Sequence, residues 1–493
     1  MDLFGRTTIY TDAEEITREN VVPEVYNALT VHEENAEQIQ YLYDYYRGKQ
    51  PILERVKEIR PEICNTIVEN RAQEIVDFKT GYLAGEPLQY ISMTGDLETS
   101  DRVARLNRFM LTKSKASKDK ALIEWDMICG TAYRLGLPAE EDELAEEGDA
   151  PFDLMTLDPR QTFVIYSSDI WHRPMAGVYF TTDADGLRTF TVYTKDKYFK
   201  LVESDDAQRN VPGYDAYIDS EEAYTLGVIP IIEYPANNAK LGSFETVITL
   251  LDAINTVDSN RLDGVEQFIQ SLLVLINCYL PEDVTVADIM QSGMIELKSS
   301  GENKADLKLL SEQLNQTETQ TLKDDMYRAV LTIVGMPSQA SGSQSDSSNN
   351  GAVILRNGWS QAEARAKDSE LMFKESERRF LRLILRICRD LSDLDIMVSD
   401  IDYRFTRRNY EDILTKSQVL TTMLGTDKID PKLSFNACGL FTDPESAYLQ
   451  SMAWYAAHGG TVSGVSENSD DGSDVSESPA DVSDTADEEE TAV

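Results

Sequence analysis

Residues 227–268 read GVIPIIEYPANNAKLGSFETVITLLDAINTVDSNRLDGVEQF, and the change of pattern within them decides the fold. The first part, VIPIIEYP, is rich in branched apolar residues and predicts a strand. From about residue 243 the apolar residues recur at helical spacing on one face, at positions 247, 251, 254, 262, 265, 269 and 272. We therefore predict a long helix over 243–274. Its single apolar stripe, interrupted by Asp258, suits packing against other helices, including those of another copy.

The residues before this stretch divide into a helical part and a β-rich part. Apolar residues at helical spacing predict helices within 13–84 and over about 101–132. Between 153 and 235, runs rich in Val, Ile, Tyr, Phe and Thr predict strands separated by turns. One of these turns, TTDADG at 181–186, resembles the start of a calcium loop. The later ligands are missing, so we interpret it as a hairpin turn.

The residues after it are mainly helical. A mixed segment at 275–312 precedes a predicted helix at 313–335, and a third helix is predicted over about 352–393. The run DIMVSDIDYRFTR then alternates as a strand does, and two short helices are predicted between 409 and 460. Residues 461–493 hold eleven acidic residues and no Lys or Arg, and their composition predicts disorder. The fold class is therefore α+β and mainly helical.

A polar loop separates the second and third of these helices. It reads SQASGSQSDSSNNG at 338–351 and has no branched or aromatic apolar residue, so it cannot form a core of its own. A helix-to-helix connection normally needs only about 2–8 residues. Loops of this length inside compact proteins are typically functional or disordered.

Composition excludes some classes of function. The net charge is −41, and −30 remains without the eleven acids of the tail, so the surface should repel nucleic acid rather than hold it. The five cysteines lie far apart without a CxxC pair, which predicts free thiols in a reducing compartment. No signal peptide is expected, and SLLVLINCYL is about half as long as the roughly twenty residues a membrane span needs.

The chain offers little for catalysis. It has no GxxxxGK[ST] loop, no HExxH and no GxSxG elbow, and its histidines, His32, His172 and His458, are too scattered for a metal motif. We therefore expect no enzyme activity, no cofactor and no metal. Five arginines recur between 378 and 389, interleaved with acids, which favours a salt-bridged face over a DNA-binding one.

In the order of its parts, the chain resembles the portal proteins of tailed bacteriophages with long non-contractile tails, in the branch that includes Bacillus siphophage portals. YYRGKQPIL (45–53) and NTIVENRAQEIVDFKTGYLAGEPLQY (65–90) look like two family segments near the N-terminus. The stretch at 227–268 is the most specific match. VGMPSQ…NNGAVILRNGW (334–359) and GLFTDPESAYLQ (439–450) follow in the family's order. Asn350-Gly351 stands where the family has Ser-Gly, and the usual Asn-rich loop is Ser-rich here.

The resemblance implies a ring, normally a dodecamer, at one capsid vertex, through which double-stranded DNA passes without sequence preference during packaging, retention and ejection. Its partners would be the terminase large subunit, the head-completion or neck adaptor protein, the scaffold and the major capsid protein, with no membrane. The protein would belong to the virion and occur in the host cytoplasm during assembly. The implied parts are a wing (1–242), stem helices (243–274 and 313–335), a clip (275–312), a tunnel loop (338–351), a wing spine helix with its following strand (352–408), a crown (409–460) and an acidic tail (461–493).

Two groups of site residues follow from this resemblance. The tunnel loop would face DNA with polar side chains, namely Ser341, Ser343, Gln344, Ser345, Ser347, Asn349 and Asn350. The clip would dock its partners through Lys298, Lys304 and Lys308.

Two readings without a channel remain open. A cytosolic acidic adaptor or scaffold would use the long helices in a smaller coiled assembly, although the β-rich segment at 153–235 disfavours a pure coiled coil. A nuclease or other DNA-processing enzyme would need a clustered acidic metal site, which nothing here distinguishes from background acids.

Overall fold

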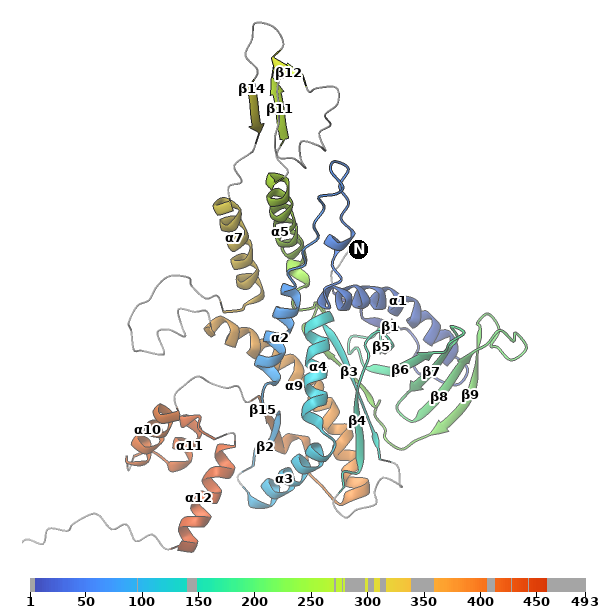
Figure 1. Ribbon diagram of the computed structural model, residues 1–493. Helices are drawn as coiled ribbons and strands as arrows, with labels where there is room; N and C mark the ends of the chain where they lie inside the picture. Colours follow the sequence, from blue (N-terminus) through green and yellow to red (C-terminus); the bar gives the residue numbers. More distant parts are fainter. Residues whose placement is uncertain are drawn as a thin grey trace, which may run out of the picture.

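The computed structural model describes residues 5–94, 96–139, 149–269, 272–276, 278–279, 298–299, 306–310, 316–337, 359–405, 413–426, 428–441 and 443–458 of the 493-residue chain (Figure 1). The described α-helices are α1 (Val21–Tyr46), α2 (Arg71–Ala84), α3 (Leu97–Thr112), α4 (Lys115–Cys129), α5 (Ile248–Ile269), α7 (Gln316–Val334), α9 (Trp359–Ser392), α10 (Ile413–Leu424), α11 (Pro431–Cys438) and α12 (Pro444–His458). Short 3-10 helices lie at Pro51–Glu54, Glu245–Val247 and Val398–Asp400.

The strands are β1 (Ile9–Thr11), β2 (Gln89–Ser92), β3 (Thr131–Pro138), β4 (Phe152–Leu157), β5 (Thr162–Ser167), β6 (Pro174–Thr182), β7 (Arg188–Tyr193), β8 (Lys197–Glu203), β9 (Ala216–Ala223), β10 (Ile231–Pro235), β11 (Leu272–Ile276), β12 (Cys278–Tyr279), β13 (Lys298–Ser299), β14 (Asp306–Leu310) and β15 (Ile401–Arg404). The predicted α+β class is confirmed.

One flank of the molecule is a six-stranded sheet in the order β1-β5-β6-β7-β8-β9. Strands β5 to β9 run antiparallel to their neighbours, and β1 joins the edge of β5 in parallel. Alternate residues such as Phe190 and Val192 on β7 point inward and pack with Val21 and Val25 of α1 in one core. The turn after β6 is the predicted hairpin, in which Gly186 takes a φ of +87° and Asp183 Oδ1 accepts two backbone N–H groups.

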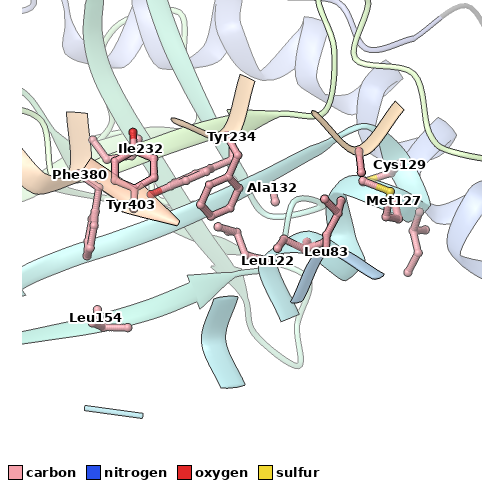
Figure 2. Close-up of a cluster of buried hydrophobic side chains, with 14 of the residues drawn as sticks. Leu83, Leu122, Met127, Cys129, Ala132, Leu154, Ile232, Tyr234, Phe380 and Tyr403 are labelled. Carbon is pink, nitrogen blue, oxygen red and sulfur yellow. The ribbon is translucent and has the colours of Figure 1, made fainter. Parts of the chain in front are cut away.

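The other core lies under the long helix α9, which crosses a three-stranded sheet in the order β10-β3-β4 (Figure 1). Figure 2 shows its side chains converging from α2, α4, the sheet and α9, among them Leu122, Tyr234 and Phe380. Apolar burial of this kind contributes about 25 cal/mol per Å², which makes it the main force that holds α9 in place.

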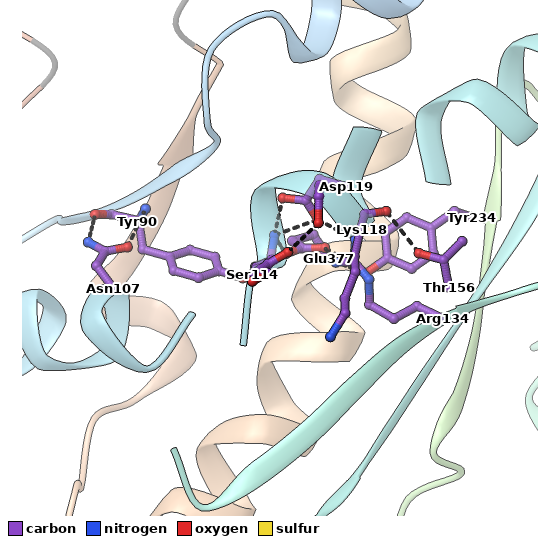
Figure 3. Close-up of polar contacts among 11 residues, drawn as sticks. Tyr90, Asn107, Ser114, Lys118, Asp119, Arg134, Thr156, Tyr234 and Glu377 are labelled. Carbon is purple, nitrogen blue, oxygen red and sulfur yellow. Dashed lines mark hydrogen bonds and ion pairs between the residues drawn. The ribbon is translucent and has the colours of Figure 1, made fainter. Parts of the chain in front are cut away.

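A buried ionic network fixes the direction of α9 across this sheet (Figure 3). The Glu377 carboxylate lies 2.9 Å from Lys115 Nζ and 3.1 Å from Arg134 Nη1, and it accepts hydrogen bonds of 2.6 Å from Tyr90 and Tyr234. Asp119 completes the network by binding both Lys115 and Arg134. Buried charges are tolerated only when they are paired in this way.

Several sequence-based boundaries were wrong. The helix predicted over 101–132 is two helices, because Ser114 takes a left-handed φ of +52° between α3 and α4. It also ends earlier, at Cys129, since Gly130 takes a φ of +80° and a Cβ there would lie 2.2 Å from the Lys240 carbonyl oxygen. Strand β3 begins directly after this glycine. The helix predicted to reach residue 274 ends at Ile269, and β11 follows.

The predictions of the helices at 313–335 and 352–393, of ion pairs on the latter helix and of free thiols agree with the described residues. Helix α7 lies within the predicted 313–335, and α9 covers the described part of 352–393. Two of the five arginines on α9 form the expected ion pairs, Arg379 with Glu375 at 2.7 Å and Arg389 with Asp395 at 2.8 Å. Cys64, Cys129, Cys388 and Cys438 are free thiols. Among the described helices, none is long and apolar enough to cross a membrane.

Candidate functional site

Helices α5 and α7 stand side by side. One end of each packs into the core under α9, and the other end leads to the strands β11 to β14 (Figure 1). They run antiparallel and are joined by polar contacts. Lys323 Nζ of α7 lies 2.9 Å from Asp258 Oδ2 of α5, and Arg261 Nη1 donates to Gln320 Oε1 at 2.7 Å. Asp258, which interrupts the predicted apolar stripe, is therefore the residue through which α5 binds α7.

A third segment joins this pair. Lys323 Nζ also lies 2.6 Å from Glu69 Oε2, so two carboxylates share one ammonium group. Burial alone would raise the pKa of Glu69, but hydrogen bonds to Asp258 and Lys323 outweigh it and lower the pKa to about 2. Burial raises the pKa of the neighbouring Asp258. The base of the α5–α7 pair is thus held by charge as well as by the apolar residues Val330 and Val334.

The face of α5 away from these contacts carries a polar stripe that the apolar pattern did not reveal. Asn255, Ser259 and Asp263, four residues apart, are almost completely buried. Asn255 Oδ1 accepts the N–H of Glu69, Ser259 Oγ accepts that of Ile67, and Asp263 Oδ1 accepts that of Asn65, at 2.7–3.0 Å. Four helical residues rise about 6.0 Å and two extended residues about 6.6 Å, so the segment 65–69 can lie along the helix in register.

The predicted apolar stripe therefore holds only in the lower half of α5. Val247, Leu251 and Ile254 are buried as expected. Leu262 and Val265 are instead 38% and 40% exposed. The sequence does carry a signal for the polar stripe, since polar residues at 255, 259 and 263 recur at helical spacing. The prediction of the buried face rested on the apolar residues alone.

Asp263 also fixes the loop that comes before the extended segment. We call residues 55–64 the flanking loop. The Asp263 carboxylate lies 2.7 Å from Lys57 Nζ and 3.1 Å from Arg55 Nη1, and Lys57 Nζ further donates to the Ile63 carbonyl at 3.0 Å. The flanking loop is thus tied to α5 along the side of the α5–α7 pair opposite α7 (Figure 1).

The far end of the pair carries two of the three predicted docking lysines. The backbone of β11 pairs antiparallel with β14, where Val274 faces Lys308, and β12 pairs with β13, where Tyr279 faces Lys298. Lys298 and Lys308 therefore lie at the same end of the molecule, beyond α5 and α7. Lys304 lies outside the described residues.

All seven residues predicted for the tunnel loop, Ser341, Ser343, Gln344, Ser345, Ser347, Asn349 and Asn350, lie outside the described residues. The structure describes the residues nearest to this loop on either side, up to 337 and from 359. Gly335 ends α7 with a φ of +73°, and Met336 after it is buried. Trp359 begins α9, with its ring 6.0 Å from Phe78 and 5.9 Å from Tyr82 of α2.

A pocket of about 600 Å³ lies between α2, α9 and the end of α7, next to both ends of the tunnel loop. Lys79 and Arg365 both line it. Burial and then the charge of Arg365 lower the pKa of Lys79 to about 8. Asp126 and Asp368 line the same pocket, so its wall carries acidic as well as basic groups.

In the part of the chain that the structure describes, there is no group of three or more His, Cys, Asp or Glu side chains that could hold a metal ion. His32 is buried against Phe163, His172 lies in the turn after β5, and His458 ends α12. The polar side chains around α5 and α7 described above join segments of the chain to one another.

Comparison with known proteins identifies the family. No curated protein sequence matches the chain. A chain from the structure described as "Neck of empty GTA particle computed with C6 symmetry" has a TM-score of 0.39 and 12% identity, over 75% of this chain and 90% of that chain. A chain from "Neck of native GTA particle computed with C12 symmetry" has a TM-score of 0.37 and 13% identity, over 75% and 89%.

The family model described as "Phage portal protein, SPP1 Gp6-like" matches residues 27–456. Because this match takes in the α5–α7 pair, α9 and nearly all of both sheets, the chain belongs to the phage portal protein family.

Proposed function

We propose that the protein forms a closed ring at one vertex of the phage capsid, through whose centre the genome enters and leaves. The family is a structural one of the capsid vertex, and membership supports the proposal. The observation that carries it is the α5–α7 pair, which is anchored at one end in the core under α9 and leads at the other end to paired strands (Figure 1). Helix pairs of this kind, repeated around an axis, would line a tube.

The parts of the chain take roles in this proposal. Helices α5 and α7 are the stem, the strands beyond them the clip, residues 1–242 the wing, α9 with β15 its spine, and α10 to α12 the crown. The loop at 338–351 narrows the channel. The described residues nearest to it, Met336 and Trp359, lie at the base of the stem, which supports this role.

The charge of the chain suits a channel through which DNA must move. Each phosphate that Lys or Arg neutralises adds affinity that depends on salt, and many such contacts would hold the DNA in place. A net charge of −41 and a tunnel loop built of Ser, Gln and Asn avoid such a grip. We infer passage of double-stranded DNA without sequence preference.

Partners follow from the two ends of the stem. Lys298, Lys304 and Lys308 would dock the terminase large subunit during packaging, in the host cytoplasm, and the head-completion or neck adaptor protein afterwards. The scaffold and the major capsid protein would contact the wing. ATP hydrolysis belongs to the terminase in this proposal.

The test is the mass of the purified full-length chain by mass photometry, with negative-stain images of the same sample. We expect a ring of about 665 kDa, twelve times 55.4 kDa, with a central hole. A stable dimer or tetramer without a hole would contradict the channel and favour an acidic adaptor with a smaller assembly.

A further inference from the structure

The flanking loop exposes aliphatic side chains although it is firmly held. Val56 and Ile59 are 86% and 82% exposed, among the most exposed large apolar residues described. The contacts of Arg55 and Lys57 with Asp263 fix the loop on α5, so these side chains cannot turn into either core. Apolar residues presented on a fixed surface are typical of contact with another protein.

The loop also contains a cation, Arg60, one nitrogen of which lacks a hydrogen-bond partner. Arg60 Nη1 is shielded from solvent and has no hydrogen-bond partner, and the residue takes a φ of +54°, which is rare for a side chain other than glycine. Buried polar groups without partners are uncommon in native proteins, and each one calls for an explanation. A carboxylate supplied from outside the chain would satisfy this guanidinium.

The opposite side of the stem offers a matching surface. We call Glu318, Leu322 and Asp325 the outer face of α7, since they lie on one side of the helix at spacings of three and four and are exposed. Leu322 is 53% exposed and stands between the two acids. The outer face therefore combines an aliphatic side chain with negative charge. The flanking loop combines aliphatic side chains with the cation Arg60, which lies in sequence between the exposed acids Glu58 and Glu62.

A closed ring needs two such surfaces. Identical subunits that follow one another around an axis use two different, complementary patches, one on each side of the subunit. Figure 1 shows α7 on one side of α5 and the flanking loop on the other. The two surfaces thus lie where a ring built around the stem would bring them together.

The register of α5 and α7 also shows which residues of the two helices lie at the same height along the stem. Asp258 contacts Lys323 and Arg261 contacts Gln320. Because the helices are antiparallel, a residue three positions later on α5 lies beside a residue three positions earlier on α7. By this count Asp263, which holds the flanking loop, lies at the height of Glu318. Rotation about a ring axis parallel to the stem does not change the height of a residue. The flanking loop of one protomer would therefore meet the outer face of α7 in the next protomer at the height of Glu318.

We propose that the flanking loop of each protomer docks on the outer face of α7 in the next protomer, with Arg60 against Glu318, and Val56 and Ile59 against Leu322. This inference rests on the proposed ring. It assigns the stem its subunit contact and explains why an otherwise acidic surface does not simply repel its neighbour.

The test measures ring formation of the full-length chain by mass photometry over a series of protein concentrations. We expect the double variant V56S/I59S, and separately Arg60→Glu, to raise the concentration of half-assembly at least about tenfold, because apolar burial or an ion pair is lost at every subunit contact. The double variant R60E/E318R restores the pair with reversed signs and should recover ring formation.

Two variants serve as controls. Leu111→Ser removes an equally exposed apolar side chain (79%) on α3, far from the stem, and should leave the half-assembly concentration unchanged. R60E/D325R places the compensating charge on the same face of α7 but about 10 Å further along, and should not restore rings. Circular dichroism and melting temperature check that every variant folds.

The outcomes separate the inference from the proposed function. A wild-type chain that forms no ring under any condition overturns both. Wild-type rings together with undiminished rings of V56S/I59S and R60E overturn the inference alone. Equal recovery of ring formation in R60E/E318R and R60E/D325R would also overturn the inference, because it would mean that only the net charge of the chain matters.

Discussion

Glu377 ties α9 to four other elements. Its carboxylate binds Lys115 of α4 and Arg134 of β3, and it accepts hydrogen bonds from Tyr90 on β2 and Tyr234 on β10. Glu377→Gln would leave two cations buried with one fewer counter-charge. Removing one partner of a buried ion pair typically costs about 3–5 kcal/mol. We expect a loss of this size in the free energy of unfolding, measured by urea denaturation at pH 7.

The same variant should lose its effect in acid. Burial alone would raise the pKa of Glu377, but Lys115 and Arg134 outweigh it and lower the pKa from 4.5 to about 2. A carboxylate whose pKa is lowered on folding stabilises the protein above its unfolded pKa, and this stabilisation is lost as the pH falls towards the folded value. The difference between wild type and variant should therefore be constant above about pH 5 and shrink between pH 4.5 and pH 2.

Glu375→Gln is the matched control for both measurements. Glu375 pairs with Arg379 on the exposed side of the same helix, where an ion pair contributes about 0.3–0.5 kcal/mol. Equal losses in the two variants would show that the buried network does not hold α9.

At the scale of elements, the polar stripe of α5 orders the segment 65–69 and the flanking loop. Asp263→Ala removes the acceptor of the Asn65 N–H and the counter-charge of Arg55 and Lys57. Hydrogen bonds to charged groups contribute about 1.5–3 kcal/mol. We expect a loss of this order in stability and faster hydrogen exchange at the amide of Asn65, measured by exchange mass spectrometry, while exchange in the sheet stays unchanged.

Asn260→Ala serves as its control, since Asn260 contacts the flanking loop only through Arg55 among the described contacts and at an exposed site. It should change exchange at Asn65 little. If Asp263→Ala behaves like this control, the flanking loop is held by other contacts, and the docking surface proposed for it loses its rigid support.

Elements were predictable from sequence where one signal dominated. The helices α7 and α9 and the hairpin turn at Gly186 follow directly from periodicity and turn chemistry. Strand β3 was missed because apolar residues continue across Gly130, and only the close approach of the Lys240 carbonyl shows why the helix must end there. A contact between residues more than a hundred positions apart leaves no local pattern.

The candidate site was predictable only in outline. The spacing of Asn255, Ser259 and Asp263 was visible, but their meaning depends on the segment 65–69, which is almost two hundred residues away in sequence. Val56 and Ile59 read as ordinary apolar residues until the structure shows them exposed on a fixed loop.

The tunnel loop allows a prediction at this same scale. Met336 and Trp359, which lie on either side of the loop, make contacts of their own, so deleting residues 340–350 should leave both helices and ring formation intact while DNA packaging or retention falls. Rings are checked by negative stain and packaging by the DNA content of the particles. Loss of rings in the deletion would mean that the loop is a structural part of the assembly rather than a contact for DNA.

At the scale of the whole molecule, charge opposes assembly. A ring of twelve copies would bring together twelve chains of −41 each, and like charges repel most strongly at low ionic strength. The subunit contacts therefore have to overcome a repulsion that the composition of the chain itself creates. Eleven of these charges lie in residues 461–493.

Truncation after residue 460 should separate folding from assembly. The buried residues of the two described core clusters lie between Ile9 and Tyr403, and the last eight residues of α12 are exposed, so we expect an unchanged melting temperature and circular dichroism spectrum. In about 0.01 M salt, where charges act over about 30 Å, the truncated chain should form rings at a lower protein concentration than the full-length chain. In 1 M salt, where the range is about 3 Å, the two chains should form rings at the same concentration. Insoluble protein after truncation would mean that the tail takes part in folding. An effect that persists in 1 M salt would mean that the tail acts through contacts rather than through charge.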